Sequence, residues 1–364
     1  MKKIFIFIFL FLFTLIFFAK SALAIYDPLK IPNNKYGIHI LFPEELNEAS
    51  NLINSSGGDW GYVTIPIRAS DKNLEKWQKF MDDSKKYHII PIIRIATEGD
   101  YFIKASWEKP NNYYAIDFAN FLSSLDWPTK NRYVIIFNET NRGDEWGGAP
   151  SASEYADILN NAVNAFKQRS DKFFIIMGGL DNASVNAQGV SVNQFNYMRE
   201  MNQAVPGIFE KIDGLAVHSY PNPAFASPPS YLGTNSIYSF NYQQDLIKEF
   251  TGKTLPIFIT ETGWSSDTVS ELKQTQYYKE AFESVWNDKN IVAVTPFVFH
   301  AEEGPFRQFS FILDNQKTKL YAGFLSFAKT KGEPQAEPVI KNSNEQKKEA
   351  ETKKFEIKFL ICYI

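Results

Sequence analysis

Residues 133–139 read Tyr-Val-Ile-Ile-Phe-Asn-Glu, five β-branched or aromatic residues followed by a polar pair. Such an apolar run is typical of a strand that is buried on both faces, as in a parallel sheet. Helical periodicity follows from Ser151 to Gln168, where apolar residues trace one face. A buried strand followed by an amphipathic helix predicts one βα unit.

The same kind of apolar run recurs along the chain, and its successive ends lie 26 to 44 residues apart. The eight predicted strands are Tyr36–Leu41, Tyr62–Ile67, Ile89–Ile95, Tyr133–Glu139, Phe173–Met177, Gly214–Tyr220, Pro256–Glu261 and Ile291–Phe299. Eight such units predict an α/β fold, a (β/α)8 TIM barrel, as a single domain over residues 25–332. A doubly wound sheet is the competing architecture, but no Gly-x-Gly-x-x-Gly turn follows the first run.

The two ends of the chain differ in composition from the predicted barrel. Two lysines precede an apolar run, and small residues follow it up to Ala24, so we predict a signal peptide over residues 1–24. An uncleaved membrane anchor is the alternative. Residues 333–364 form a charged low-complexity tail, predicted to be disordered. We therefore expect a secreted or cell-envelope protein, and export without disulfides points to a bacterium.

Composition also limits the class of function. The chain has 38 Lys+Arg against 41 Asp+Glu, so it carries no positive excess for nucleic acid. Its only cysteine is Cys362, and its four histidines show no His-x-His or His-Glu-x-x-His spacing. We expect no metal, no cofactor and a monomer.

Two lone glutamates end predicted strands, Glu139 on the fourth and Glu261 on the seventh. In a TIM barrel the carboxyl ends of the strands carry the chemistry, so both would face one mouth. Such a pair suits glycoside cleavage, where one carboxyl group protonates the leaving oxygen and the other stays ionised. Capping of a helix or pairing with a lysine is the structural alternative for either residue.

With Asn138-Glu139 on the fourth strand and Thr260-Glu261-Thr262-Gly263-Trp264 on the seventh, the sequence resembles the clan of retaining (β/α)8 glycoside hydrolases. This clan includes cellulases, β-mannanases, β-xylosidases and endo-β-galactanases. The resemblance implies that Glu139 is the general acid/base, that Glu261 is the nucleophile and that Asn138 binds the sugar 2-hydroxyl. One departure is Thr140, where many members carry proline.

Further polar candidates stand on the third and sixth strands. Strand alternation places His218 and Tyr220 on one side, and the resemblance implies that both line the site, with Tyr220 donating to the nucleophile. Arg94 lies among isoleucines and needs a carboxylate partner. By resemblance it orients the nucleophile, and an internal ion pair is the alternative.

Aromatic rings are expected at a sugar site because sugars expose C–H faces. Trp264 and Trp146 fall in predicted loops on the catalytic side, whereas Trp107 fits better as a loop anchor. The clan commonly has a tryptophan platform after the eighth strand. This chain offers Phe297 or Phe299 there, and we select Phe299.

The sequence therefore predicts a secreted retaining glycosidase that cleaves a β-linked glycan by double displacement. A noncatalytic carbohydrate-binding barrel and a cell-wall transglycosylase are the alternatives. Membrane association is expected only if the N-terminal segment is retained.

Overall fold

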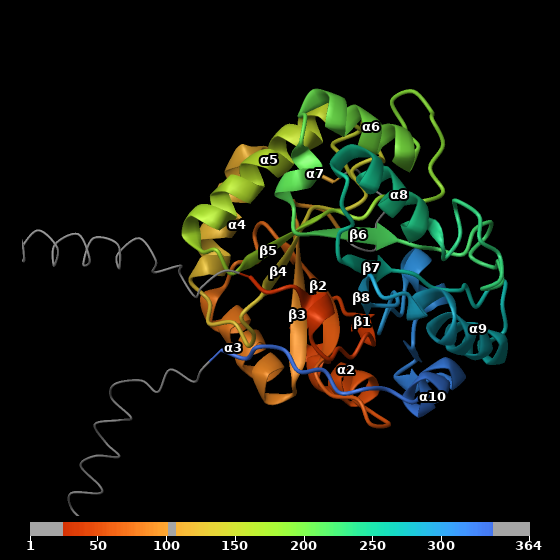
Figure 1. The fold of residues 1–364 in the computed structure, drawn as a ribbon. Coiled ribbons are helices and arrows are strands. Elements are labelled where there is room, and N and C mark those ends of the chain that lie inside the picture. Colours follow the sequence, from red (N-terminus) through yellow and green to blue (C-terminus); the bar gives the residue numbers. More distant parts are fainter. Residues whose placement is uncertain (1–24, 101–106, 338–364) are drawn as a thin grey trace, which may run out of the picture.

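Eight parallel strands form one sheet in sequence order, β1 to β8, in the computed structural model, which describes residues 25–100 and 107–337 (Figure 1). The strands are β1 (Gly37–His39), β2 (Gly61–Arg68), β3 (Ile89–Ala96), β4 (Arg132–Ile136), β5 (Phe173–Met177), β6 (Gly214–His218), β7 (Ile257–Glu261) and β8 (Ile291–Val294).

The sheet closes on itself because β8 pairs with the segment that contains β1. Tyr36 forms a parallel bridge with Val294, and the Val294 amide donates to the Lys35 carbonyl at 2.9 Å. The His39 amide donates to the Pro296 carbonyl at the same distance. Closure confirms the predicted TIM barrel over the doubly wound alternative.

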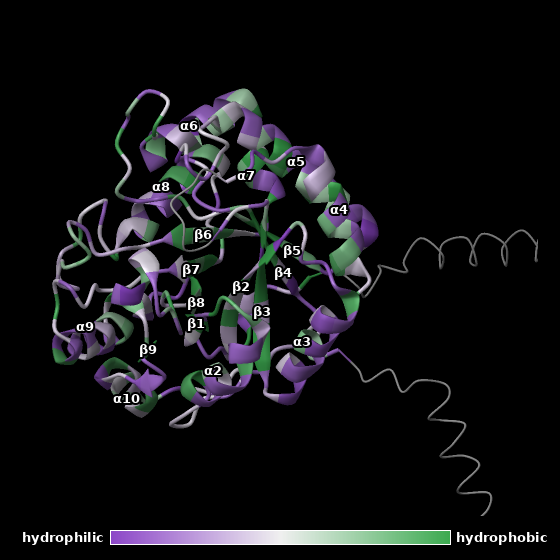
Figure 2. Cartoon of the chain, turned by 180° about the vertical axis from the view of Figure 1, so that it is seen from behind, coloured by the Kyte–Doolittle hydropathy of each residue, from purple (hydrophilic) through white to green (hydrophobic). Residues whose placement is uncertain are grey.

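Helices alternate with the strands and surround the barrel (Figure 1). They are α2 (Leu46–Ile53), α3 (Leu74–Lys86), α4 (Asn112–Ser123), α5 (Ala152–Arg169), α6 (Gln194–Ala204), α7 (Ile208–Lys211), α8 (Ser239–Thr251), α9 (Glu271–Glu283) and α10 (Lys319–Ser326). Several begin at the residue types that cap helices: Asn73 accepts from the Lys76 amide before α3, and Thr318 accepts from the Tyr321 amide before α10. Figure 2 shows hydrophobic strands at the centre and mostly hydrophilic outer surfaces on the helices.

Side chains from alternate strand positions fill the barrel. On β4, Tyr133 and Ile135 belong to the interior cluster, while Val134 and Ile136 pack outward against the helices. The buried runs predicted from the sequence are therefore buried on both faces, which fixes the direction of every side chain up to the end of the strand.

Most predicted strand limits lie within two residues of those observed, but β4 ends three residues early and β8 is much shorter than predicted. It ends at Val294 instead of continuing to Phe299. Pro296 interrupts the run, and proline has no amide hydrogen to extend the ladder.

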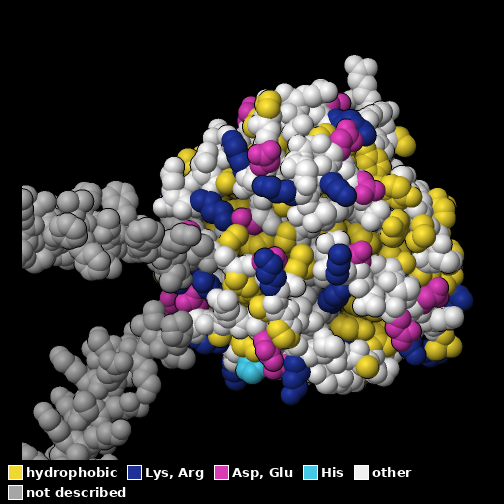
Figure 3. Space-filling view, in the orientation of Figure 1, with side chains coloured by type: hydrophobic (Ala, Val, Ile, Leu, Met, Phe, Trp, Pro, Cys, Tyr) yellow, Lys and Arg dark blue, Asp and Glu magenta, His cyan; other side chains and the backbone are white. Residues whose placement is uncertain are grey.

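The predicted signal peptide and most of the predicted tail lie outside the described residues. Within residues 25–100 and 107–337, no helix has the length and apolar character that a membrane crossing requires. On the face shown in Figure 3, basic and acidic side chains are interspersed, in keeping with the nearly balanced composition.

Candidate active site

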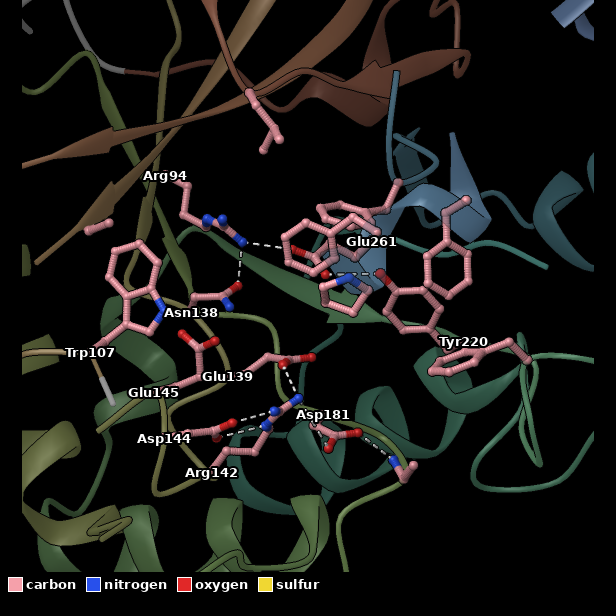
Figure 4. A pocket seen from close by; sticks show the side chains of 18 of the residues that line it. Arg94, Trp107, Asn138, Glu139, Arg142, Asp144, Glu145, Asp181, Tyr220 and Glu261 are labelled. Atoms are coloured by element: carbon pink, nitrogen blue, oxygen red, sulfur yellow. Dashed lines mark hydrogen bonds and ion pairs between the residues drawn. The ribbon is translucent and has the colours of Figure 1, made fainter. Parts of the chain in front are cut away.

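A cavity of about 390 Å³ opens at the carboxyl ends of the strands. This volume falls within the usual range for ligand sites, roughly 300–1,000 Å³. Five of the predicted site residues line it, and Figure 4 shows their side chains together: Arg94, Asn138, Glu139, Tyr220 and Glu261.

Glu139 and Glu261 converge on this cavity from opposite walls of the barrel. Glu261 is the last residue of β7, and Glu139 follows the end of β4. Each residue is only 7% exposed, and an oxygen of one carboxylate lies within 4.8 Å of an oxygen of the other. Two carboxylates that close must carry different partners or share a proton, because like charges at this distance repel.

The backbone after β4 explains why both Asn138 and Glu139 reach the cavity. Phe137 and Glu139 adopt left-handed conformations with φ of 62° and 34°, so the strand stops at Ile136 and not at Glu139 as predicted. In a regular strand, neighbouring side chains would point to opposite faces. The left-handed Phe137 instead packs outward, and its ring centroid lies 6.3 Å from that of Trp146. Strained conformations of this kind concentrate at functional sites.

Glu261 accepts hydrogen bonds from a cation and a phenol. Arg94 Nη1 donates to Glu261 Oε1 at 2.7 Å, and Tyr220 Oη donates to Oε2 at 3.1 Å. Burial raises the pKa of Tyr220 well above its ordinary value, and the charges of Glu261 and Glu139 raise it further. Tyr220 therefore remains a phenol that donates, and both contacts stabilise the ionised form of Glu261.

His218 lies between the two glutamates. Its Nδ1 is 2.9 Å from Glu139 Oε1 and 3.6 Å from Glu261 Oε2. Burial disfavours the imidazolium, but the negative charges of Glu261 and Glu139 outweigh it, and the pKa of His218 is raised. His39, on β1, approaches Glu261 Oε1 to 3.9 Å, and burial together with Arg94 keeps its pKa low, so it is neutral.

Glu139 has a second partner that the sequence analysis missed. Arg142 Nη1 donates to Glu139 Oε2 at 3.0 Å, and the same guanidinium binds Asp144 at 3.0 and 2.6 Å. The negative charge of Glu139 raises the pKa of Arg142, with Asp144 and Asp181 adding to the effect. Asp144 holds the Arg142 guanidinium in place, so the guanidinium is fixed in the position from which it binds Glu139.

Asn138 is held between the side chains of Arg94 and Glu145. Its Oδ1 accepts from Arg94 Nη1, and its side chain is also hydrogen-bonded to Glu145. Arg94 thereby connects Asn138 to Glu261. The orientation of the amide is defined because its oxygen faces a group that can only donate.

Oxygen and nitrogen atoms of Glu139, His218 and Glu261 lie within 4.8 Å of one another and could reach one cation. Their oxygens already accept from Arg94, Arg142 and Tyr220. Because the glutamate oxygens already accept hydrogen bonds, this cluster is better suited to proton transfer than to binding a metal ion.

The family model described as "Glycosyl hydrolase catalytic core" matches residues 76–323, more than half of the chain and including both glutamates. The chain belongs to this glycosyl hydrolase family. No curated protein matches it in sequence.

Solved structures of low sequence identity share the fold of this glycosyl hydrolase. A family 39 glycoside hydrolase from Bacteroides cellulosilyticus WH2 is 16% identical with a TM-score of 0.57, and the match covers 84% of this chain but only 65% of that one. A family 39 β-xylosidase from Caulobacter crescentus is 13% identical with a TM-score of 0.58, covering 80% and 70%. A family 128 endo-β-1,3-glucanase from Sorangium cellulosum is 16% identical with a TM-score of 0.53, covering 80% and 98%.

Three aromatic residues predicted to bind substrate do not line the cavity of this glycosyl hydrolase. Trp264 is 1% exposed, packs against Tyr278 and donates from Nε1 to the Ser227 carbonyl. Trp146 and Phe299 are equally buried. These predictions are corrected because strand and loop sequences do not show which way an aromatic ring turns.

Other aromatic residues line the cavity instead. Trp107, assigned to loop anchoring, borders it on the acidic side, and Phe297 takes the place predicted for Phe299. On the opposite side, Phe225, Phe306 and Phe309 form an aromatic wall with Phe297. The predicted motifs gave no signal for Phe225, Phe306 and Phe309 because these residues lie outside the predicted strands.

Proposed function

We propose that this glycosyl hydrolase is a retaining β-glycosidase with Glu261 as nucleophile and Glu139 as general acid/base. The observation that carries the proposal is the approach of the two carboxylates to within 4.8 Å. Retaining enzymes place them about 5–5.5 Å apart, whereas inverting enzymes need about 6.5–9.5 Å to admit a water molecule.

In the first step, a Glu261 oxygen attacks the anomeric carbon, the glycosidic C–O bond breaks, and the leaving oxygen takes the proton of Glu139. In the second step, Glu139 takes a proton from water, whose oxygen attacks the anomeric carbon and releases Glu261. Arg94 and Tyr220 hold the Glu261 carboxylate in place for the attack through their hydrogen bonds. His218 contacts both glutamates and can interact favourably with whichever of them carries the negative charge at each step.

Asn138 supports this assignment because Arg94 connects its amide to Glu261. Its oxygen accepts from Arg94, so the amide hydrogens are left for Glu145 and for a sugar hydroxyl. A hydrogen bond to the 2-hydroxyl strengthens as the oxocarbenium-like transition state forms.

The substrate we propose is a β-linked glycan. The similar structures include a β-xylosidase and an endo-β-1,3-glucanase, and another is a complex with Manβ1-4GlcNAc. A substrate panel should therefore begin with aryl β-xylosides, β-1,3-glucan and β-mannosyl oligosaccharides, followed by product sizing.

The mechanism is tested with Glu261→Ala, Glu139→Ala and, as a control, Glu249→Gln on the exposed face of α8. Both active-site variants should lose hydrolysis, and the control should keep it. Azide should restore turnover, giving the α-glycosyl azide with Glu261→Ala and the β-glycosyl azide with Glu139→Ala. Inversion at the anomeric carbon, or full activity in either active-site variant, would refute the assignment.

We also propose that the protein is exported, on the strength of residues 1–24. Expression of the full chain followed by N-terminal sequencing should find the mature protein beginning at Ile25. A product that retains Met1 and stays in the membrane fraction would show an uncleaved anchor instead.

A further inference from the structure

Glu145 is a third glutamate in the cavity that the proposed mechanism leaves without a role. Its loop is fixed on both sides, because the Trp107 amide donates to the Asp144 carbonyl at 2.6 Å and the Gly147 amide donates to the Trp107 carbonyl at 3.0 Å. The neighbouring Trp146 ring is fully buried against Tyr155. While Trp146 anchors the loop to the outside of the barrel, Glu145 faces the cavity (Figure 4).

The side chain of Glu145 is hydrogen-bonded to Asn138. This contact lowers the pKa of Glu145, as a hydrogen bond donated to a carboxylate does, so it comes from the Asn138 amide nitrogen. Glu261, Arg94, Asn138 and Glu145 thus form one continuous chain of hydrogen bonds across the cavity. At one end of this chain Arg94 holds the carboxylate of Glu261, and at the other end Glu145 holds the amide nitrogen of Asn138.

Burial raises the pKa of Glu145 to about 8, and the negative charge of Glu139 raises it further, whereas Arg94, Arg142 and the contact with Asn138 oppose the rise. Asp144 and Asp100 line the same cavity and add to its negative charge. Glu145 therefore keeps its proton to a higher pH than an exposed glutamate does. Its carbonyl oxygen can accept from Asn138 while its hydroxyl can donate into the cavity.

We propose that Glu145 is a positioning residue that holds the Asn138 amide in the orientation needed to bind the sugar. This inference rests on the proposed function. The neutral form places no further negative charge beside Glu139, which has to release and recover a proton in each turnover. Ionisation of Glu145 would add that charge and oppose the formation of carboxylate at Glu139.

The decisive comparison is between Glu145→Gln and Glu145→Ala, with Glu249→Gln as the matched control for loss of a surface carboxylate. Glutamine has the shape and the carbonyl oxygen of the neutral acid but cannot ionise. On an aryl β-glycoside that the protein hydrolyses, Glu145→Gln should keep kcat/KM at pH 6 within about threefold, and the part of the alkaline decline centred near pH 8 should disappear. Glu145→Ala should lower kcat by about tenfold or more with little change in KM, because the sugar contact of Asn138 strengthens in the transition state.

An infrared difference spectrum between the protein and Glu145→Gln supplies a readout that does not depend on turnover. The band of a protonated carboxyl group should be present at pH 6 and lost with a midpoint near pH 8. An ionised Glu145 at pH 6, or full kcat in Glu145→Ala, would overturn the inference. If those results occur while Glu261→Ala and Glu139→Ala remain inactive, only the role of Glu145 fails. Active Glu261→Ala or Glu139→Ala would instead reject the proposed function.

Discussion

Arg142 Nη1 lies 3.0 Å from Glu139 Oε2, so the carboxyl group proposed to donate a proton is in contact with a guanidinium. The guanidinium holds in place the carboxyl group that would act as acid in the first proposed step and as base in the second. Asp144 holds the guanidinium from its other side. Arg142 therefore positions Glu139 for both steps.

Arg142→Gln should impair catalysis. Without the guanidinium, the Glu139 carboxyl group keeps its contact with His218 but loses the one that holds its other oxygen, and kcat/KM at pH 6 should fall by roughly tenfold. The measurement is the steady-state kinetics of an aryl glycoside. Arg199→Gln, on the exposed face of α6, removes the same charge elsewhere and should leave kcat/KM unchanged. An unchanged kcat/KM in Arg142→Gln would mean that the contact does not position Glu139.

Arg94→Met should both destabilise the protein and impair catalysis. Arg94 and Glu261 are paired with side chains 9% exposed, and loss of one partner leaves a buried charge, at a cost of about 3 kcal/mol or more. Denaturant unfolding measures that cost, and kcat/KM at pH 6 should fall at least about tenfold. Arg68→Met, at the end of β2, is the control, since Arg68 donates to the Gly99 carbonyl and not to either glutamate. Equal losses in both variants would count against a special role for Arg94.

Trp264→Ala and Phe297→Ala should separate stability from substrate binding. The buried Trp264 packs against Tyr278 and Trp286, so its truncation should cost about 3–5 kcal/mol of unfolding free energy. Phe297 faces the cavity, so Phe297→Ala should raise KM. Trp264→Ala should leave the KM of the folded fraction unchanged. Thermal unfolding and KM for the folded fraction distinguish the two effects. A larger rise in KM for Trp264→Ala would restore Trp264 as a substrate contact.

Glu45 should make stability depend on pH. It holds the amides of Leu41 and Phe42, and burial raises its pKa to about 7. A folded-state pKa above the unfolded value gives stability that is complete below about pH 4.5 and is lost as pH rises through about 7. Glu45→Gln should therefore show a shallower decline in melting temperature between pH 4.5 and 8, by roughly 2 °C or more. Parallel curves for the two proteins would contradict this.

The sequence was sufficient to predict the barrel and the position of Glu261 at the end of a strand. Each buried run has a fixed period, so Glu261 at the end of β7 is placed on the cavity by the strand itself. Arg94 was predicted to need a carboxylate because an arginine among buried isoleucines cannot remain unpaired, and its partner is Glu261.

Side chains beyond the strands could not be placed in this way. The left-handed turns at Phe137 and Glu139 reset the alternation after β4, and nothing in the local residue types announces them. Arg142 and Glu145 follow that turn, so their direction depends on loop contacts such as those between Trp107 and Asp144. The burial of Trp264 likewise depends on α9, because Tyr278 on that helix packs against the indole ring. The motif around Trp264 does not reveal this contact.

The cavity has an acidic side, with Asp144, Glu145 and Asp181, and an aromatic side that includes Phe225 and Phe309. A ligand that carries a positive charge near the anomeric position and a hydrophobic face beyond it would match both sides at once. Ring-shaped amines that imitate a hexose should therefore dissociate more slowly than the corresponding neutral sugars.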